Sequence, residues 1–225
     1  GQTLTVTGDF VHASGSIDGP GACYFSGATA TFQTAALPAA ELVFATSELA
    51  APAPISTAGT SSLHHNNTLS ADIANSGRIN VWHLGNQVTG QLTTTASSVI
   101  DLEIAQNADP QITFANGFLN HGMIELDQSV GFNRTVRLNV STGELVNSAT
   151  GTIHAQGPNG TRTLDAPLRN QGTLTVDTNM TLSHVSETMT NEGGIDIAAG
   201  QTLTVTGNFV HASGSIDGPG ACYFS

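Results

Sequence analysis

The segment Asn170–Ile197 reads NQGTLTVDTNMTLSHVSETMTNEGGIDI and contains one short pattern twice, starting at Asn170 and again at Asn191. Each copy has Asn, a variable residue, Gly, a variable residue and an aliphatic residue, with a second aliphatic residue two positions later. Alternating apolar and polar residues are typical of a β-strand that is buried on one face only. The segment therefore indicates a repeating unit that contains at least one short strand.

The same pattern occurs in other parts of the chain, as NSGRINV at 75–81, NHGMIEL at 120–126 and a longer variant, NSATGTIHA, at 147–155. A second short strand is indicated by alternating apolar residues such as Met180 and Leu182. With SSVIDLEIA at 97–105 included, the first aliphatic residues recur at intervals of about 21–24 residues, with one longer interval between Ile124 and Ile153. The aligned residues are Ile79, Ile100, Ile124, Ile153, Leu174 and Ile195.

A repeat of this length, without helical periodicity, fits one turn of a parallel β-helix. We therefore predict an all-β fold, a right-handed parallel β-helix (solenoid) with coils of about 21–24 residues. Gly and Asn in the pattern are expected at corners that need a left-handed backbone, and stacked Asn side chains are expected to hydrogen-bond along the column. The rival architecture is a string of β-sandwiches, which needs hairpin turns and longer strands.

The N-x-G-x-I/L coils, followed by G-x-T-L-T-V, resemble the repeats of filamentous-haemagglutinin-type exoproteins and other giant bacterial surface proteins. The resemblance covers residues 74–207 most clearly. It implies a right-handed parallel β-helix that forms an extracellular, elongated stalk or fibre at the cell surface and serves adhesion or envelope structure.

A longer period joins the two ends of the sequence. Residues 1–26 recur as residues 200–225, with one change from Asp9 to Asn208. We therefore expect residues 1–225 to form a single continuous β-helix segment from a tandem array. Since duplication extends length, we predict a non-enzymatic structural or adhesive rod that associates with copies of itself, end to end or side by side, with surface glycans as further candidate partners.

Composition excludes several classes of partner. The chain has 17 acidic residues, five arginines, no lysine and a net charge of −12. This charge repels nucleic acid and anionic lipid, so we expect neither as a partner. The sequence has no apolar run of about 20 residues, which argues against direct insertion into a membrane.

One acidic patch follows from the predicted register. If Ile100 stacks on Ile124, the residues beside them bring four carboxylates together on the outer surface. Like charges on neighbouring strands repel, so a hard cation such as Ca²⁺ is a candidate cofactor here, while a solvated acidic stripe needs no metal. The patch also suggests a carbohydrate-binding or polysaccharide-cleaving site, for which Arg134 and Arg137 are the nearest basic candidates. The four carboxylates are Asp101, Glu103, Glu125 and Asp127.

Cysteine and histidine give weaker signals. Cys23 and Cys222 occupy the same position in the two copies, and an offset of about nine coils places them beyond the roughly 7 Å that a disulfide spans between Cα atoms. These thiols are therefore expected either to be buried as small apolar residues or to form a crosslink between chains. Among eight histidines, His64 and His65 are adjacent and His83 follows about one coil later. No pair has a zinc-protease spacing, and we expect the histidines to be scattered and exposed.

Overall fold

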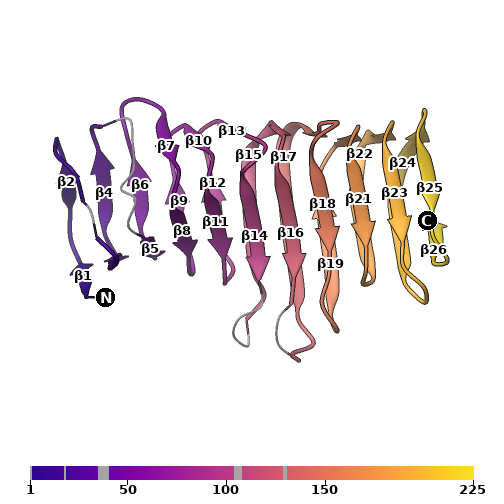
Figure 1. Cartoon of the computed structure of the whole chain (residues 1–225), viewed down its shortest axis with the longest axis horizontal. Helices are drawn as coiled ribbons and strands as arrows, with labels where there is room; N and C mark the ends of the chain where they lie inside the picture. The colour runs from indigo at the N-terminus through magenta and orange to yellow at the C-terminus, as the bar shows by residue number, and fades with distance from the viewer. Residues whose placement is uncertain (1, 18, 35–40, 104–107, 129–130) are drawn as a thin grey trace.

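The computed structural model describes residues 2–17, 19–34, 41–103, 108–128 and 131–225. Every regular element in these ranges is a β-strand, and the strand pairs are parallel. The strands stack into an elongated solenoid whose two chain ends lie at opposite ends of the long axis (Figure 1). The predicted all-β parallel solenoid is confirmed, with about ten turns of about 21 residues.

The turns of the solenoid contribute strands to three faces. Face 1 is a sheet of 11 strands: β1 (Thr3–Val6), β3 (Ala22–Ser26), β5 (Glu41–Ala45), β8 (Thr60–Leu63), β11 (Arg78–Val81), β14 (Val99–Glu103), β16 (Met123–Asp127), β18 (Thr152–Ala155), β21 (Thr173–Val176), β23 (Gly194–Ile197) and β25 (Ser215–Asp217). Face 2 contains, in order, β2 (Phe10–His12), β4 (Thr29–Phe32), β6 (Glu48–Ala50), β9 (Thr68–Leu69), β12 (Asn86–Val88), β15 (Gln111–Asn120), β17 (Thr135–Asn147), β19 (Thr161–Asp165), β22 (Met180–Asn191), β24 (Thr202–His211) and β26 (Ala221–Phe224).

Face 3 is built from shorter strands and from the second parts of long ones. Its first three strands are β7 (Ile55–Thr57), β10 (Ile73–Asn75) and β13 (Leu92–Thr94). The long strands β15, β17, β22 and β24 continue from face 2 onto face 3, where β20 (Leu168–Asn170) pairs between β17 and β22. Pairing shifts between Asn116 and Phe118 in β15, and between His184 and Met189 in β22, mark this corner.

The register along face 1 is the one that the repeated pattern predicts. Ile100 of β14 is paired with Ile79 on one side and with Ile124 on the other. Pairs from Ile124 through Ile153 and Leu174 to Ile195 continue the same column. The longer interval between Ile124 and Ile153 therefore enlarges a coil without breaking the column. On face 2 the expected second strands also pair, with Met180 on Leu203 and Leu182 on Val205.

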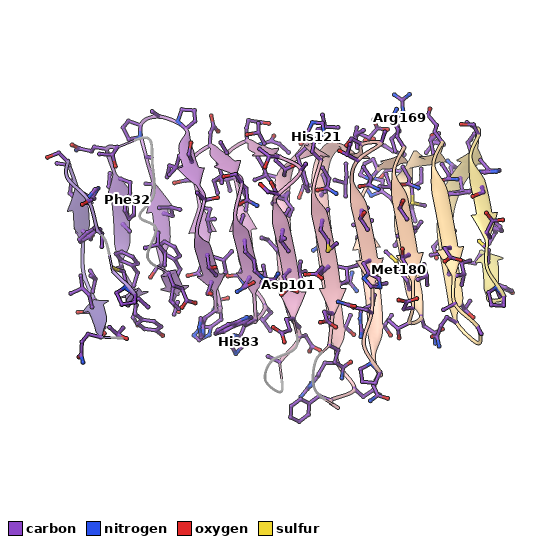
Figure 2. All side chains as sticks on the ribbon, in the orientation of Figure 1. Phe32, His83, Asp101, His121, Arg169 and Met180 are labelled. Carbon is purple, nitrogen blue, oxygen red and sulfur yellow. The ribbon has the colours of Figure 1, made fainter. Side chains whose placement is uncertain are left out.

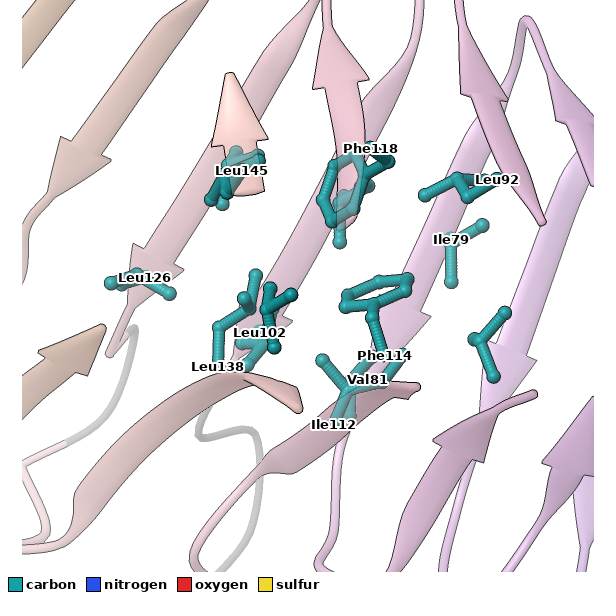
Figure 3. Packing of buried hydrophobic residues seen from close by; sticks show 14 of the residues in the cluster. Ile79, Val81, Leu92, Leu102, Ile112, Phe114, Phe118, Leu126, Leu138 and Leu145 are labelled. Atoms are coloured by element: carbon teal, nitrogen blue, oxygen red, sulfur yellow. The ribbon is translucent and has the colours of Figure 1, made fainter. Parts of the chain in front are cut away.

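The core is one continuous column of buried apolar side chains along the solenoid, and Figure 3 shows a part of it from close by. Ile79 and Leu102 from face 1 face Phe114 from face 2 and Phe118 from face 3, and all four are buried. Burying one such side chain stabilises the fold by roughly 1.5–3 kcal/mol. At the N-terminal end the column is aromatic, and the rings of Phe25 and Phe44 stack with centroids 5.1 Å apart.

A ladder of buried asparagine side chains runs along the corner between faces 3 and 1. The side-chain amide of each Asn donates to the side-chain oxygen of the next, at 2.9 Å from Asn120 to Asn147, 2.8 Å from Asn147 to Asn170 and 2.7 Å from Asn170 to Asn191. Asn191 Nδ2 lies 3.1 Å from His211 Nδ1, which extends the ladder by one coil. The predicted stacking of asparagines is therefore confirmed. Each buried amide is satisfied by its neighbours, as buried polar groups require.

The prediction that Gly and Asn of the pattern adopt a left-handed backbone at the corners is wrong. Gly77, Gly122, Gly172 and Gly193 do not have a positive φ, and neither do the asparagines of the ladder. A Cβ on Gly172 would instead lie 2.2 Å from the carbonyl oxygen of Gly151 in the preceding coil, and the other three glycines meet a backbone oxygen at the same distance. Gly is needed because the backbones of successive coils approach closely at this corner, where a Cβ has no room.

The two copies of the repeated end segment, residues 1–26 and 200–225, lie on different faces of the solenoid. In the first copy Leu4 pairs with Cys23 on face 1, whereas in the second copy Leu203 pairs with Cys222 on face 2, in the same register. Ten strands of face 1, from β1 to β23, make nine turns, and the second copy begins on the next face. The long period of the sequence therefore spans nine turns and one further face.

Candidate functional site

The four predicted carboxylates lie on the outer surface of face 1. Asp101 pairs with Glu125 and Glu103 with Asp127, as the register predicts. Figure 2 shows Asp101 near the middle of the long axis of the solenoid. Their apolar neighbours Ile100 and Leu126 point inward and are fully buried. The structure therefore brings these acidic side chains together on two successive coils.

Arg78 of β11 supplies the positive charge that this patch needs. Its Nη2 atom contacts Asp101 Oδ2 and lies 3.2 Å from Glu125 Oε2, while its Nε donates to Asn80 Oδ1 at 2.7 Å. Burial acts to lower the pKa of Arg78, but the attraction of Asp101 and Glu125 outweighs burial and raises it. The arginine is therefore held as a cation between carboxylates from two coils.

Asp101 is the most perturbed group of the patch. Its side chain is only 3% exposed, and burial raises its pKa to about 6, against the opposing effect of Arg78. Glu125 and Glu103 raise the pKa further because their charges repel that of Asp101. Asp101 Oδ1 is buried without a hydrogen-bond partner in the described structure. One carboxylate oxygen is thus paired with Arg78, and the other oxygen is not.

The sequence predicted a Ca²⁺ site at these four carboxylates. Within the described ranges, no group of three or more His, Cys, Asp or Glu side chains is arranged to hold a metal ion. Arg78 occupies the space between Asp101 and Glu125 that a cation between these carboxylates would need. Calcium binding by Asp101, Glu103, Glu125 and Asp127 stays a prediction.

The two basic residues expected near the patch belong to other parts of the fold or have other contacts. Arg137 lies on β17 of face 2, and Arg134 Nη1 lies 3.8 Å from Asp109 Oδ2. Sequence reasoning missed Arg78 because the register places it two strands from Glu125, a distance of 47 residues along the chain. The signal available in the sequence was its place in the NSGRINV repeat, one coil before Asp101.

Another arginine is buried behind the same coils. Arg162 is fully buried, with Nε 3.1 Å from the carbonyl oxygen of Leu126 and 2.9 Å from that of Gln156. Its Nη1 donates to the carbonyl oxygen of Asn159 at 2.8 Å. Burial lowers the pKa of Arg162 to about 10, partly offset by Asp127. Arg162 therefore fixes the turn after β18 and has a structural role.

Three of the eight histidines gather with Trp82 at one edge of face 1, which corrects the expectation of scattered histidines for these three. His64 lies against Trp82 and His83, with ring centroids 4.8 Å and 5.4 Å away, and His65 contacts His83 at 5.5 Å. Burial lowers the pKa of His64, and the neighbouring His83 and His65 lower it further. Contacts between the rings hold the cluster together. The sequence signal was the one-coil spacing of these residues.

The two cysteines are free thiols in different environments. Cys23 is buried between β1 and β5, while Cys222 is only partly buried in the last strand. Burial raises the pKa of both thiols, which lowers their reactivity near neutral pH. They lie near opposite ends of the solenoid, in β3 and β26, as the spacing predicts. Cys222 is the one open to a second chain, so an interchain crosslink stays a prediction.

Two hollows lie at the ends of the solenoid. The larger, of about 310 Å³, opens at the N-terminal coil and is lined by Leu4, Ile17 and Cys23 among others. The smaller, of about 240 Å³, lies at the C-terminal coil between Gln201 and Ala221. None of the four carboxylates lines either hollow.

Comparisons with protein families, characterised proteins and solved structures find no match for this chain. The β-solenoid is therefore shown by the structure alone. Among the described residues, no helix is long and apolar enough to cross a membrane.

Proposed function

We propose that the chain is a segment of a structural rod that extends along its axis and associates with copies of itself. The observation that carries the proposal is the ladder of parallel strand pairs, which runs from β1 to β26 on faces 1 and 2 through the described residues. A single apolar column accompanies it. Such a construction grows by adding coils, and each coil is stabilised by its neighbours alone.

We expect the 225-residue chain, studied on its own, to associate along the axis through the coils at its two ends, which no further coil of this chain covers. Five large apolar side chains of these coils are exposed. Phe224 is 55% exposed, whereas its copy Phe25, covered by β5, is fully buried. Strand edges with unpaired backbone groups and exposed apolar residues pair readily with other chains. The exposed residues are Leu4, Val11, Val210, Tyr223 and Phe224.

The setting that we propose for this rod is the outside of a bacterial cell, as a stalk or fibre with an adhesive or envelope role. Support comes from the resemblance of the coils to filamentous-haemagglutinin-type repeats, now joined by the solenoid fold. The net charge of −12 favours solubility and disfavours contact with anionic lipid. Catalytic turnover is not part of this proposal.

Sedimentation velocity over a range of concentrations tests the proposed association. We expect the sedimentation coefficient of the 225-residue chain to rise with concentration, and Phe224→Asp to suppress the rise. Leu84→Asp is the matched control, since Leu84 is 52% exposed and lies between β11 and β12, many coils from either end. A chain that sediments as a monomer at every concentration contradicts the proposal, and so does equal suppression by both substitutions.

A second candidate function is polysaccharide binding or cleavage at the acidic patch. The observation that favours it is the carboxyl group of Asp101, whose Oδ1 has no hydrogen-bond partner in the described structure and whose pKa is raised to about 6 by burial. Trp82 and His64 add rings of the kind on which sugars pack, on the same face. Asp101→Asn and Glu125→Gln, assayed for cleavage and binding of neutral and acidic polysaccharides, test this candidate. The candidate is rejected if the unaltered chain cleaves no polysaccharide and if the two substitutions leave polysaccharide binding unchanged.

A further inference from the structure

The exposed asparagines of the solenoid share a sequence motif that its buried asparagines lack. In the described ranges five asparagines are exposed, and all of them except Asn208 begin the motif Asn-x-Thr. Of the seven buried asparagines, which include those of the ladder, none begins Asn-x-Thr or Asn-x-Ser. Asn-x-Thr/Ser is the acceptor motif for attachment of a sugar to an asparagine side chain. The four exposed asparagines with the motif are Asn66, Asn133, Asn159 and Asn179.

All four motifs begin at the same edge of the solenoid, the corner between faces 1 and 2. Their asparagines lie in the turns from β8 to β9, from β16 to β17, from β18 to β19 and from β21 to β22. The last three of these turns belong to successive coils and lie along the lower edge of the view in Figure 1. The threonine of each motif is the first or second residue of the face 2 strand that follows. One local arrangement therefore recurs in four coils.

The side-chain nitrogens of these four asparagines are not used by the fold. Within the described ranges, Nδ2 of none of them donates a hydrogen bond to another group of the protein. Asn179 is held through its other atom, since Oδ1 accepts a hydrogen bond from the backbone N–H of Thr202 at 2.9 Å. The nitrogen that forms the bond to a sugar is thus available at an exposed turn in the folded chain.

A fifth motif, at Asn139, lies elsewhere and has different contacts. Asn139 lies within β17 on face 2 and is followed by Val140 and Ser141. Its side chain is half-buried, with Nδ2 donating to Thr113 Oγ1 of the neighbouring coil at 3.1 Å and with Oδ1 buried. The fold therefore presents four motifs at one edge and holds the fifth within a sheet.

We propose that the four exposed motif asparagines are attachment sites for N-linked sugars. The donor is a sugar activated by a diphosphate, carried either by a nucleoside or by a lipid. Nδ2 forms a bond to C1 of the sugar, while the bond from C1 to the diphosphate oxygen breaks and its electron pair leaves with the diphosphate. The amide nitrogen loses one proton to a base of the transferase. This inference does not rest on the proposed self-association, which stands or falls separately.

The sites are close enough to cover the edge on which they lie. Thr135 pairs with Thr161, so the motifs of Asn133 and Asn159 end on adjacent strands about 4.8 Å apart. Attached sugars are bulky, hydrophilic and confined to the surface. Sugars on these coils therefore cover the corner between faces 1 and 2 and leave face 3 bare.

Peptide mass spectrometry of the protein isolated from the cells that produce it tests the inference directly. We expect added sugar mass on the four exposed motif asparagines and none on Asn139. The size of the addition distinguishes the donors, since a nucleoside diphosphate sugar adds single sugars and a lipid-linked donor adds a preassembled chain. Unmodified asparagine at all four sites overturns the proposal, and so does equal occupancy at Asn139.

Threonine variants produced in the same cells show whether attachment follows the motif. Thr161→Ala removes the hydroxyl two residues after Asn159 and leaves that asparagine in place, so we expect the sugar on Asn159 to be lost, and Thr161→Ser to retain it. Thr173→Ala is the matched control, because Thr173 is also exposed at the first residue of a strand but belongs to no motif. Sugar that persists on Asn159 in Thr161→Ala contradicts the proposal, and so does its equal loss in Thr173→Ala.

Discussion

Arg78 Nη2 contacts both Asp101 Oδ2 and Glu125 Oε2, and so joins carboxylates from two successive coils of face 1. The contact offsets a repulsion that the solenoid register imposes, because parallel strands place Asp101 directly beside Glu125. The two neighbouring carboxylates are therefore accommodated because a third coil, that of β11, supplies Arg78. We therefore expect the stability of the solenoid to depend on this side chain more than on exposed ion pairs such as Arg169–Glu192.

Arg78→Met is expected to lower the free energy of unfolding by about 1–3 kcal/mol, because Asp101 is left buried beside Glu125 without a cation. Urea denaturation at pH 7 measures the loss. Arg169→Met is the control, since the pair of Arg169 with Glu192 is exposed, and its loss should be much smaller. Equal losses in the two variants contradict the role given to Arg78.

Asp101 predicts a specific pH dependence of stability. Its pKa of about 6 in the folded chain exceeds the ordinary value of 3.8, so the folded state binds a proton more tightly than the unfolded state. The stabilisation by the protonated form is complete below about pH 4 and is lost as the pH rises through 6. Relative to Asp101→Asn, the parent chain should lose about 2–3 kcal/mol between pH 4 and 7. Parallel curves for the two chains in urea titrations reject this account.

The asparagine ladder predicts a cost for removing one member. Asn147→Ala leaves the amide of Asn120 and the side-chain oxygen of Asn170 without their partner in the buried corner. The expected loss is about 2–4 kcal/mol, from unpaired polar groups and the cavity together. Asn133→Ala, at an exposed position, is the control and should be nearly neutral. Chemical denaturation of both variants provides the comparison.

Close packing of coils predicts that Gly172→Ala is destabilising by about 1–3 kcal/mol, since its Cβ would lie 2.2 Å from backbone oxygens of the preceding coil. Gly8→Ala is the matched control, because no atom lies within 4 Å of the added carbon. Thermal unfolding monitored by circular dichroism distinguishes them. A Gly172→Ala chain as stable as the parent shows that the corner has room for a side chain.

The calcium prediction is testable through stability. If Asp101, Glu103, Glu125 and Asp127 hold Ca²⁺, the unfolding temperature should rise with calcium and fall with a chelator. Glu103→Gln/Asp127→Asn should abolish that response, since the contacts of Arg78 are with Asp101 and Glu125 and leave this second pair to the metal. An unfolding temperature that is unchanged by chelation rejects the calcium prediction.

Much of the fold could be predicted from the local sequence pattern, because every coil of a solenoid repeats the same short strands with alternating apolar residues. The column from Ile79 to Ile195 followed from alternation and spacing alone, and the longer coil between Ile124 and Ile153 did not disturb it. The reason for Gly172 could not be read from the sequence, since it depends on how closely two backbones approach. Arg78 was missed for a similar reason: its partners are one and two coils away, and only the side-chain geometry shows that it reaches both.

Electron microscopy of the concentrated 225-residue chain tests the central claim most directly, namely that uninterrupted coils form a rod that continues from one chain into the next. We expect unbranched filaments with an axial repeat of about 50 Å per chain, set by about ten coils at a spacing of about 4.8 Å. Isolated particles of that length at every concentration, or compact globules, contradict the account.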